Sequence, residues 1–253
     1  MKNDKEKEIN KNQLEGRNAV LELLRSGRDI EKIIIQKGNA EGTIRRILAM
    51  AKEQGVVVQE VVKQKLDDMS QTKNHQGIIA LVPEHDYADV SDILKRAEEK
   101  GEKPFIVILD NITDPHNLGA VIRTAECAGA HGVIIPKRRS VGLTAVVGKT
   151  SAGAIEYMPV ARVTNISKTI DDLKKAGIWV ACADMGGDDY FDASLDGAIA
   201  IVIGSEGDGV SRLVKEKCDF VVSMPMYGKI SSLNASVAAG LLMYEVVRQR
   251  HYK

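Results

Sequence analysis

The sequence predicts an α/β protein of two domains, the second built on a mostly parallel sheet with helices on both faces. Short apolar segments alternate with amphipathic ones along most of the chain, which is the pattern of helices packed on a sheet. Residues 105–109 and 199–203 are apolar throughout, as expected of strands that are buried on both faces. The length of 253 residues exceeds that of a typical small domain and is comfortable for two.

The first domain is predicted to span residues 13–83, after a charged tail at residues 1–12 that we expect to be disordered. A helix is expected over residues 16–25, where Val20, Leu21, Leu23 and Leu24 recur at helical spacing. The other expected elements of this domain are a strand at 30–36, a helix at 41–54, a strand at 56–60, a helix at 61–69 and a strand at 77–82. This order predicts helices packed on a small sheet.

The second domain is predicted to span residues 104–253, after a polar linker at 84–103 that carries an amphipathic helix at 90–100. We expect strands at 105–109, 133–135, 178–183, 199–203 and 220–224. We expect helices at 117–128, 144–152, 166–176, 212–217 and 236–250. Strands that alternate with helices in this way predict a largely parallel sheet.

Composition excludes several classes of protein. Lys and Arg total 35 and balance 35 Asp and Glu, so the chain lacks the overall basic charge of many nucleic-acid binders, although Arg45-Arg46 and Lys137-Arg138-Arg139 form local basic runs. Aromatic residues make up only 4%, which argues against stacking of single-stranded bases. The cysteines and histidines lack metal-ligand spacing, so no metal is expected. No signal peptide or membrane span is indicated, and a cytoplasmic location is expected.

The loop after the strand at 105–109 is the first of three candidate ligand loops. Its polar run, residues 110–119, leads into a helix that Asn117 is expected to cap and that carries Arg123. Arg near a helix start has the unfavourable sign for the helix dipole, so Arg123 is a candidate for holding an anion. The alternative is a surface ion pair with Glu126, three residues further along the helix.

The loop after the strand at 199–203 contains three glycines within residues 204–209. Glycines allow a backbone to approach a ligand closely or to adopt positive φ. The spacing resembles a dinucleotide fingerprint only weakly, because Glu206 and Asp208 would repel a pyrophosphate. The loop suits a ligand that carries hydroxyls or a positive charge better, and the alternative is a plain tight turn.

The third loop is the Ser-Ser-Leu-Asn-Ala-Ser run at residues 231–236, at the start of the last helix. One Ser or Asn is enough to cap a helix, so four such residues within six positions indicate that some of them face a ligand. The alternative is a helix with an unusually polar cap. Because all three loops follow strands of one parallel sheet, they are expected to form a single pocket at its carboxyl edge.

At these loops the chain resembles the SpoU/TrmH class of SPOUT methyltransferases. Three motifs carry the resemblance: Asn117 to Arg123 in Asn-Leu-Gly-Ala-Val-Ile-Arg, Gly204-Ser205-Glu206-Gly207, and Ser232-Leu233-Asn234-Ala235-Ser236. The match covers residues 104–253. Residues 15–20 and 75–77 resemble the ribosomal-protein-like substrate-binding domain that precedes the catalytic domain in 23S rRNA guanosine-2′-O-methyltransferases and their relatives.

The resemblance implies a trefoil knot in the C-terminal domain, a homodimer built across that domain, and S-adenosylmethionine as the methyl donor. By position, Gly204, Met224 and Leu233 would bind the donor. The reaction site would be lined by Asn117, Arg123, Glu206, Ser232 and Asn234. The implied substrate is a ribose 2′-hydroxyl of RNA, that of a guanosine in 23S rRNA, with tRNA as the alternative.

Other interpretations stay open at this point. The same fold could serve a catalytically silent RNA-binding or ribosome-assembly protein, and the glycine loop alone would allow a nicotinamide-dependent oxidoreductase. Within a methyltransferase, the resemblance gives Arg123 the role of base, yet arginine is essentially always protonated. A charged Arg123 would instead clamp a phosphate and stabilise the developing alkoxide. Glu206 would hold its loop or contact the other subunit.

Overall fold

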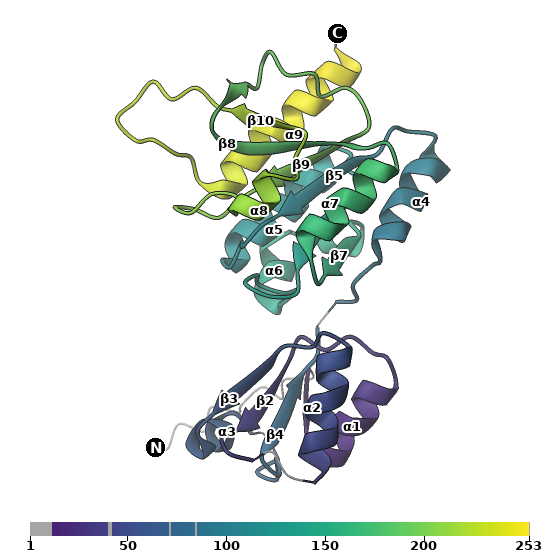
Figure 1. The fold of residues 1–253 in the computed structure, drawn as a ribbon, viewed down its shortest axis with the longest axis vertical. Coiled ribbons are helices and arrows are strands. Elements are labelled where there is room, and N and C mark those ends of the chain that lie inside the picture. The colour runs from purple at the N-terminus through teal and green to yellow at the C-terminus, as the bar shows by residue number, and fades with distance from the viewer. Residues whose placement is uncertain (1–11, 40–41, 71, 84, 253) are drawn as a thin grey trace, which may run out of the picture. The chain divides into compact units, whose positions relative to one another are not determined.

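The computed structural model describes residues 12–39, 42–70, 72–83 and 85–252 and divides the chain into two compact units, residues 1–86 and 87–253 (Figure 1). The tail expected to be disordered lies almost wholly outside the described residues. No helix among the described residues is long and apolar enough to cross a lipid bilayer. Within the same residues, no group of three or more His, Cys, Asp and Glu side chains is arranged to hold a metal ion.

Unit 1 has a four-stranded mixed sheet in the order β1-β4-β2-β3. Its elements are β1 (Gln13–Glu15), α1 (Arg17–Arg25), β2 (Lys32–Gln36), α2 (Thr43–Glu53), β3 (Val58–Val61), α3 (Lys63–Met69) and β4 (Ile78–Leu81). Strand β1 was not predicted, because three half-buried residues have too little apolar pattern to signal a strand; pairing with β4 fixes it in place. The larger core of this unit lies between the sheet and helices α1 and α2.

Unit 2 has a six-stranded sheet in the order β10-β8-β9-β5-β6-β7, and every neighbouring pair is parallel. Its strands are β5 (Phe105–Leu109), β6 (Gly132–Pro136), β7 (Val160–Val163), β8 (Trp179–Asp189), β9 (Ile199–Ile203) and β10 (Phe220–Ser223). The sequence did not predict β7, because only two of its four residues are buried. Strand β8 runs six residues beyond its predicted end at residue 183. The parallel α/β fold is confirmed, and the trefoil knot stays a prediction.

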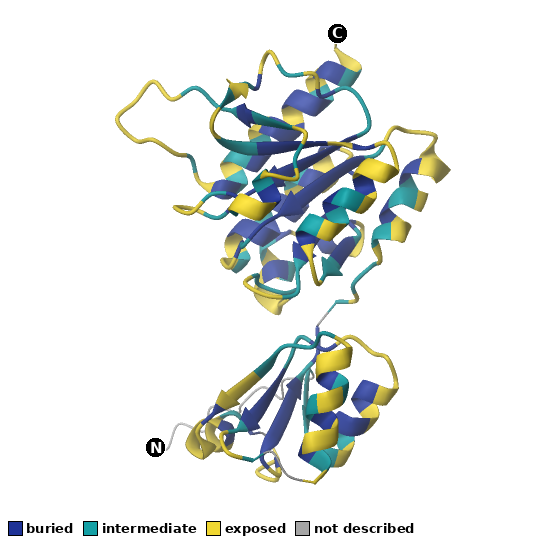
Figure 2. Cartoon of the chain, viewed as in Figure 1, coloured by how far each residue is buried: buried dark blue, intermediate teal, exposed yellow. Residues whose placement is uncertain are grey.

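Helices cover both faces of this sheet. They are α4 (Val90–Lys100), α5 (Pro115–Cys127), α6 (Ala145–Thr150), α7 (Ile166–Lys175), α8 (Arg212–Lys215) and α9 (Ala235–His251). Helices α5, α6 and α9 pack on one face, and α4, α7 and α8 on the other. All residues of β5 and β9 are buried, which explains their continuously apolar sequences (Figure 2). The segment expected as a linker contains α4, whose Ile93 and Ala97 are buried in unit 2.

Candidate active site

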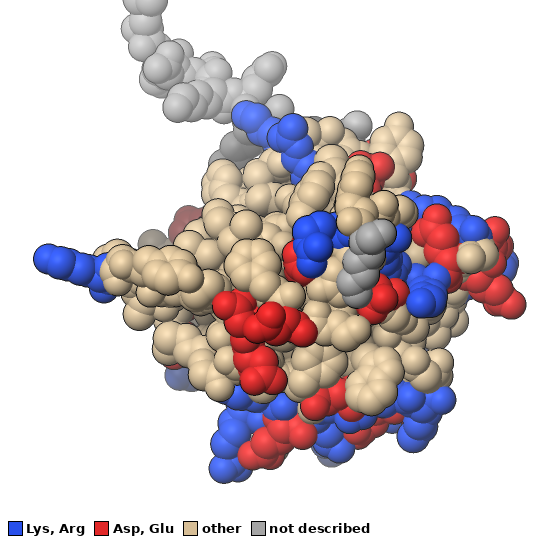
Figure 3. Space-filling view, turned by 90° about the horizontal axis from the view of Figure 1, so that it is seen from above, with Lys and Arg blue, Asp and Glu red and all other residues tan. Residues whose placement is uncertain are grey.

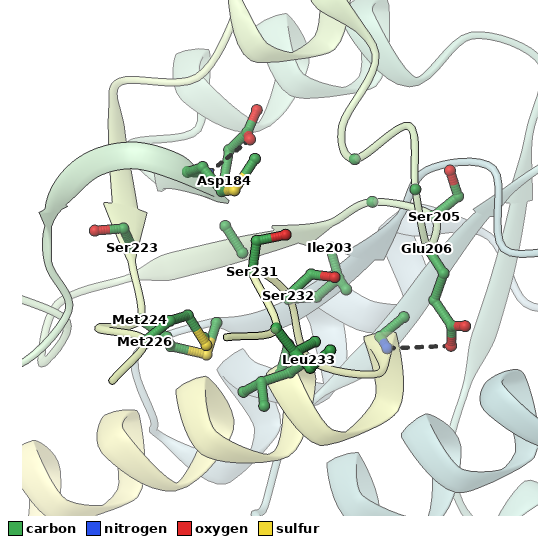
Figure 4. Close-up of a pocket in the computed structure, with 18 of the residues that line it drawn as sticks. Asp184, Ile203, Ser205, Glu206, Ser223, Met224, Met226, Ser231, Ser232 and Leu233 are labelled. Atoms are coloured by element: carbon green, nitrogen blue, oxygen red, sulfur yellow. Dashed lines mark hydrogen bonds between the residues drawn. The ribbon is translucent and has the colours of Figure 1, made fainter. Parts of the chain in front are cut away.

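A pocket of about 690 Å³ lies at the carboxyl ends of β9 and β10 and beside the middle of β8. Parallel sheets bind ligands at this edge because the loops that follow the strands converge there. The walls are formed by residues 183–186 of β8, the glycine loop after β9, the segment from Val222 to Leu233, and the first turn of α9 (Figure 4). The predicted residues Gly204, Glu206, Met224, Ser232 and Leu233 all line it.

The glycine loop is a tight turn over residues 206–208, closed by a backbone bridge between Ser205 and Gly209. Ser205 and Gly209 exchange two backbone hydrogen bonds, of 3.1 and 3.0 Å. Gly204 lies so close to this bridge that a Cβ atom there would be 2.1 Å from the carbonyl carbon of Gly209. Gly207 adopts a φ of 92°, and a Cβ atom at Gly207 or at Gly228 would meet no other atom within 4 Å. The bare backbone of these two glycines therefore faces open space in the pocket.

Asn117, Glu206 and Asn234 form one hydrogen-bonded triad that joins the three candidate loops. Glu206 Oε1 accepts from Asn117 Nδ2 at 2.8 Å and from Asn234 Nδ2 at 2.5 Å, while Asn234 Nδ2 also lies 3.0 Å from Asn117 Oδ1. The backbone N–H of Ala235 adds a weaker bond of 3.4 Å to Glu206, visible in Figure 4. Hydrogen bonds to a charged carboxylate are among the stronger ones, so the triad fixes the geometry of the loops.

The prediction that Asn117 caps helix α5 is wrong. The helix begins two residues earlier, where the Asp114 side chain accepts from the backbone N–H of His116 at 2.9 Å and proline occupies the first turn. Proline is favoured there because it lacks only an N–H that would have no helical partner. Asn117 therefore lies inside the helix. The residue is 8% exposed, and its side chain points at Glu206 and Asn234.

Asn234 caps α9 and belongs to the triad at the same time. Its Oδ1 accepts from the backbone N–H groups of Ser236 and Val237 at 3.0 and 3.3 Å, and from the Ser236 hydroxyl at 2.6 Å. Ser236 therefore supports the cap, whereas Ser231 and Ser232 line the pocket. The polar run divides into cap residues and pocket residues, as its excess of polar groups suggested.

We expect Asn234→Ala to lower the free energy of unfolding of unit 2 by roughly 1–2 kcal/mol, because it removes the cap of a long helix, one donor to Glu206 and one donor to Asn117. Ser236→Ala, which removes a single bond to Asn234, should cost about half as much or less. Urea denaturation of both variants measures the difference. Equal stabilities for the two would show that the triad contributes nothing to the fold.

Arg123 is not brought into this site within the single chain. It lies on the exposed face of α5, and among the described residues its side chain has neither a hydrogen bond nor an ion pair. The alternative of an ion pair with Glu126 is therefore not realised, although both side chains are exposed on the same helix. The Arg123 guanidinium is therefore available to bind a group from outside the chain.

Asp110, Asp184 and Lys215 also belong to the surroundings of the pocket, and no motif pointed to Asp184 or Lys215. The buried Asp110 accepts from the backbone N–H of Ser211 at 2.8 Å and so ties the end of β5 to the segment before α8. Asp184 lines the pocket and pairs with Lys215. The position of Asp184, directly after an apolar strand segment, was the available signal, because ligands meet the carboxyl ends of such strands.

Comparisons with known proteins show which family the chain resembles. Residues 104–244 match the SpoU rRNA Methylase family, and residues 13–88 match the family described as RNA 2′-O ribose methyltransferase substrate binding. YacO of Bacillus subtilis strain 168, named as a TrmH family tRNA/rRNA methyltransferase, is 52% identical over 238 residues, which cover 93% of this chain and 95% of YacO. A relative of the same family name from Staphylococcus haemolyticus is 53% identical over 237 residues, covering 93% and 95% of the two chains.

Solved structures show the same fold. The SpoU methyltransferase AviRb from Streptomyces viridochromogenes, in complex with the cofactor AdoMet, matches with a TM-score of 0.60 and 26% identity, covering 94% of this chain and 90% of AviRb. The TrmH/SpoU tRNA modifying enzyme of A. aeolicus matches with a TM-score of 0.54 and 25% identity over 62% of this chain and 84% of that enzyme. With its catalytic and substrate-binding regions both matched, this chain belongs to the SpoU/TrmH family of RNA methyltransferases.

Proposed function

We propose that this protein transfers a methyl group from S-adenosylmethionine to a ribose 2′-hydroxyl of RNA, that of a guanosine in 23S rRNA. The observation that carries the proposal is that the pocket adjoins the triad of Asn117, Glu206 and Asn234. This triad joins all three candidate loops at one edge of the sheet. Family membership supports the reaction class. A tRNA nucleotide is the second candidate, because relatives in this family are named as tRNA/rRNA methyltransferases.

The pocket suits a donor that combines a nucleoside with an amino acid. Its volume of about 690 Å³ falls in the range of sites for small molecules and cofactors. Ile203, Met224 and Leu233 supply apolar surface for a base, and the bare backbone of Gly207 and Gly228 leaves polar groups accessible. The glycine loop carries Glu206 and Asp208, which would repel a pyrophosphate. These acidic residues are compatible with a donor that carries a positively charged sulfonium.

The sulfonium makes the methyl group electrophilic, and the protein has to align the hydroxyl and remove its proton. The new bond joins the 2′-oxygen to the methyl carbon while the sulfur–carbon bond breaks, S-adenosylhomocysteine leaves with the electron pair of that bond as a neutral thioether, and the hydroxyl proton passes to solvent water. We assign Arg123 to the substrate phosphate and the developing alkoxide, where a permanent cation is most effective. The triad of Asn117, Glu206 and Asn234 positions the loops, and Ser232 faces the reacting groups from the pocket wall.

We also propose that two chains associate through α9. Val237, Leu241 and Tyr244 are spaced along one helix face and are 50%, 42% and 52% exposed. Gly240 on this helix lies against α5, because a Cβ there would be 3.8 Å from Thr124, the neighbour of Arg123. A dimer that covers this stripe brings Arg123 to the interface, which accounts for an arginine that has no hydrogen bond or ion pair among the described residues of one chain. Sedimentation analysis tests this association.

RNA contacts are expected at one edge of the unit 1 sheet. The pairing places the ends of β1, β2 and β3 and the start of β4 at this edge. The residues that follow those ends, together with the loop before β4, include five basic ones: Arg17, Lys37, Lys63, Lys65 and Lys73. Among the acidic residues of the same stretches, Glu15 binds Ser70 and Asp67 binds His75, and Asp68 follows Asp67. On the face of the molecule in Figure 3, by contrast, basic and acidic side chains are interspersed.

We expect the double variant Lys37→Ala/Lys73→Ala to weaken RNA binding by about tenfold at low salt. It should also reduce the slope of log K against log salt concentration by about two, since each lost phosphate contact removes close to one released counterion. Arg28→Ala/Lys52→Ala, at the opposite edge of the same unit, is the matched control and should bind as the wild type. Titration of rRNA and tRNA fragments at several salt concentrations measures both values, and a salt-independent affinity would contradict the assignment.

Two experiments test the function itself. Calorimetric titration with S-adenosylmethionine separates an enzyme from a silent RNA-binding protein, which would show no binding at millimolar donor. Mapping of 2′-O-methyl groups in the rRNA and tRNA of a deletion strain identifies the nucleotide. Loss of a guanosine methyl group in 23S rRNA is the expected result, whereas loss of a tRNA methyl group would favour the second candidate.

A further inference from the structure

Asp184 is a carboxylate in the donor pocket that lies outside the three motifs. It stands at the carboxyl side of the buried part of β8, next to the edge strand β10. Figure 4 shows it on the opposite side of the pocket from Leu233 and Met224, with the glycine loop of Ser205 and Glu206 to one side. It is therefore placed to contact a different part of a bound molecule from the part that Leu233 contacts.

The carboxylate of Asp184 is held in one orientation. Oδ1 accepts from the backbone N–H of Met185 at 2.7 Å, and Oδ2 pairs with the ammonium of Lys215 at 2.8 Å. The Asp184 side chain is 21% exposed, and its hydrogen bond raises the pKa of Lys215 above the ordinary lysine value. Each carboxylate oxygen can accept more than one hydrogen bond, so both oxygens keep capacity for a ligand.

The other acidic residues of the pocket do not offer the same arrangement. Oε1 of Glu206 is occupied by Asn117 and Asn234, and Asp208 is exposed on the tip of the glycine loop. Gly209 of that loop lies close to Asp184, because a Cβ there would be 3.7 Å from Oδ1. Because Gly209 has no side chain, nothing of that residue beyond its backbone screens the carboxylate from the pocket.

The charge around Asp184 favours neutral hydroxyl groups over a cation. Lys215 already balances the carboxylate at 2.8 Å, so an ammonium or sulfonium of the ligand placed there would meet a second positive charge. Hydroxyl groups meet no such repulsion and can donate to both carboxylate oxygens. In dinucleotide-binding folds built on a parallel sheet, a carboxylate likewise hydrogen-bonds a ribose hydroxyl.

We propose that Asp184 recognises the ribose hydroxyls of the methyl donor and that Lys215 positions its carboxylate. This inference rests on the proposed function, since it specifies how the same pocket recognises the methyl donor. It assigns a specificity-determining residue to β8, a strand that contributes to none of the three motifs.

Calorimetric titration of the full chain with two ligands tests the assignment: S-adenosylhomocysteine, and its analogue that lacks both ribose hydroxyls. We expect Asp184→Asn to bind S-adenosylhomocysteine about tenfold more weakly than the wild type and to bind the dideoxy analogue equally well. Equal binding of the analogue also shows that the variant is folded. Lys215→Met should give a smaller loss with the same dependence on the hydroxyls. Asp188→Asn, on the same strand outside the pocket lining, should match the wild type.

The possible results separate the two proposals. If the wild type binds S-adenosylhomocysteine and Asp184→Asn binds it equally well, the role of Asp184 is refuted while the proposed function stands. An equal loss for both ligands would also refute it, since recognition would then not involve the hydroxyls. If the wild type binds neither ligand nor S-adenosylmethionine, the proposed function itself fails. Should Asp184→Asn not fold, Lys215→Met decides by the same comparison.

Discussion

Arg123→Ala is expected to lower the rate of methyl transfer by roughly 10²- to 10³-fold while donor affinity and stability stay near those of the wild type. Arg123 is exposed, has no hydrogen bond or ion pair among the described residues, and does not line the donor pocket. Its removal therefore takes nothing from the fold, as for most surface substitutions. What it removes is a cation for the substrate phosphate and the alkoxide. Single-turnover methylation of RNA, with calorimetric titration of the donor in parallel, measures both effects.

Two further variants separate the roles assigned to this side chain. Arg123→Lys keeps the charge, so a clamp predicts partial activity with an unchanged pH profile, whereas a base predicts a profile that shifts with the new group. Glu126→Gln, one turn further along α5, is the matched control and should transfer methyl groups at the wild-type rate. Turnover of Arg123→Ala close to that of the wild type would remove Arg123 from the mechanism altogether.

Much of the fold could be predicted from the sequence because its strands are buried on both faces. Residues 105–109 and 199–203 read as uninterrupted apolar runs, and the structure places β5 and β9 at those residues. Strands β1 and β7 escaped prediction because each is short and half-buried, so their existence depends on pairing with β4 and β6 rather than on local pattern. Whether such short segments form strands depends on tertiary contacts, and these contacts cannot be seen in a single sequence.

The site shows the same division between local signal and long-range contact. The excess of polar residues at 231–236 revealed a functional loop, because it exceeded what a helix cap needs. The role of Asn117 was misjudged, since an Asn at a helix start reads as a cap when its distant partners are unknown. Glu206 and Asn234 lie 89 and 117 residues further along the chain, and only the fold brings them to Asn117. Lys215 was overlooked for the same reason, because only the fold brings it to Asp184, whereas Asp184 had a local signal in its position directly after an apolar strand segment.

Gly204→Ala is expected to abolish donor binding, with an affinity loss of at least a hundredfold. A Cβ at this position would lie 2.1 Å from the carbonyl carbon of Gly209, 2.2 Å from its oxygen and 2.2 Å from the backbone nitrogen of Val210. These atoms belong to main chain, so no side chain can rotate away to make room. The bridge between Ser205 and Gly209 would have to open, which displaces the wall that carries Glu206 and with it the triad.

The matched control for this variant is Gly197→Ala, just before β9, where a Cβ would meet nothing within 4 Å. It should bind S-adenosylmethionine like the wild type in calorimetric titration, whereas Gly204→Ala should show no heat of binding. Far-ultraviolet circular dichroism of both variants establishes that the sheet remains, since the expected damage is confined to the loop. Wild-type affinity in Gly204→Ala would mean that the donor does not depend on this wall, and the pocket at the ends of β9 and β10 would lose its role as the donor site.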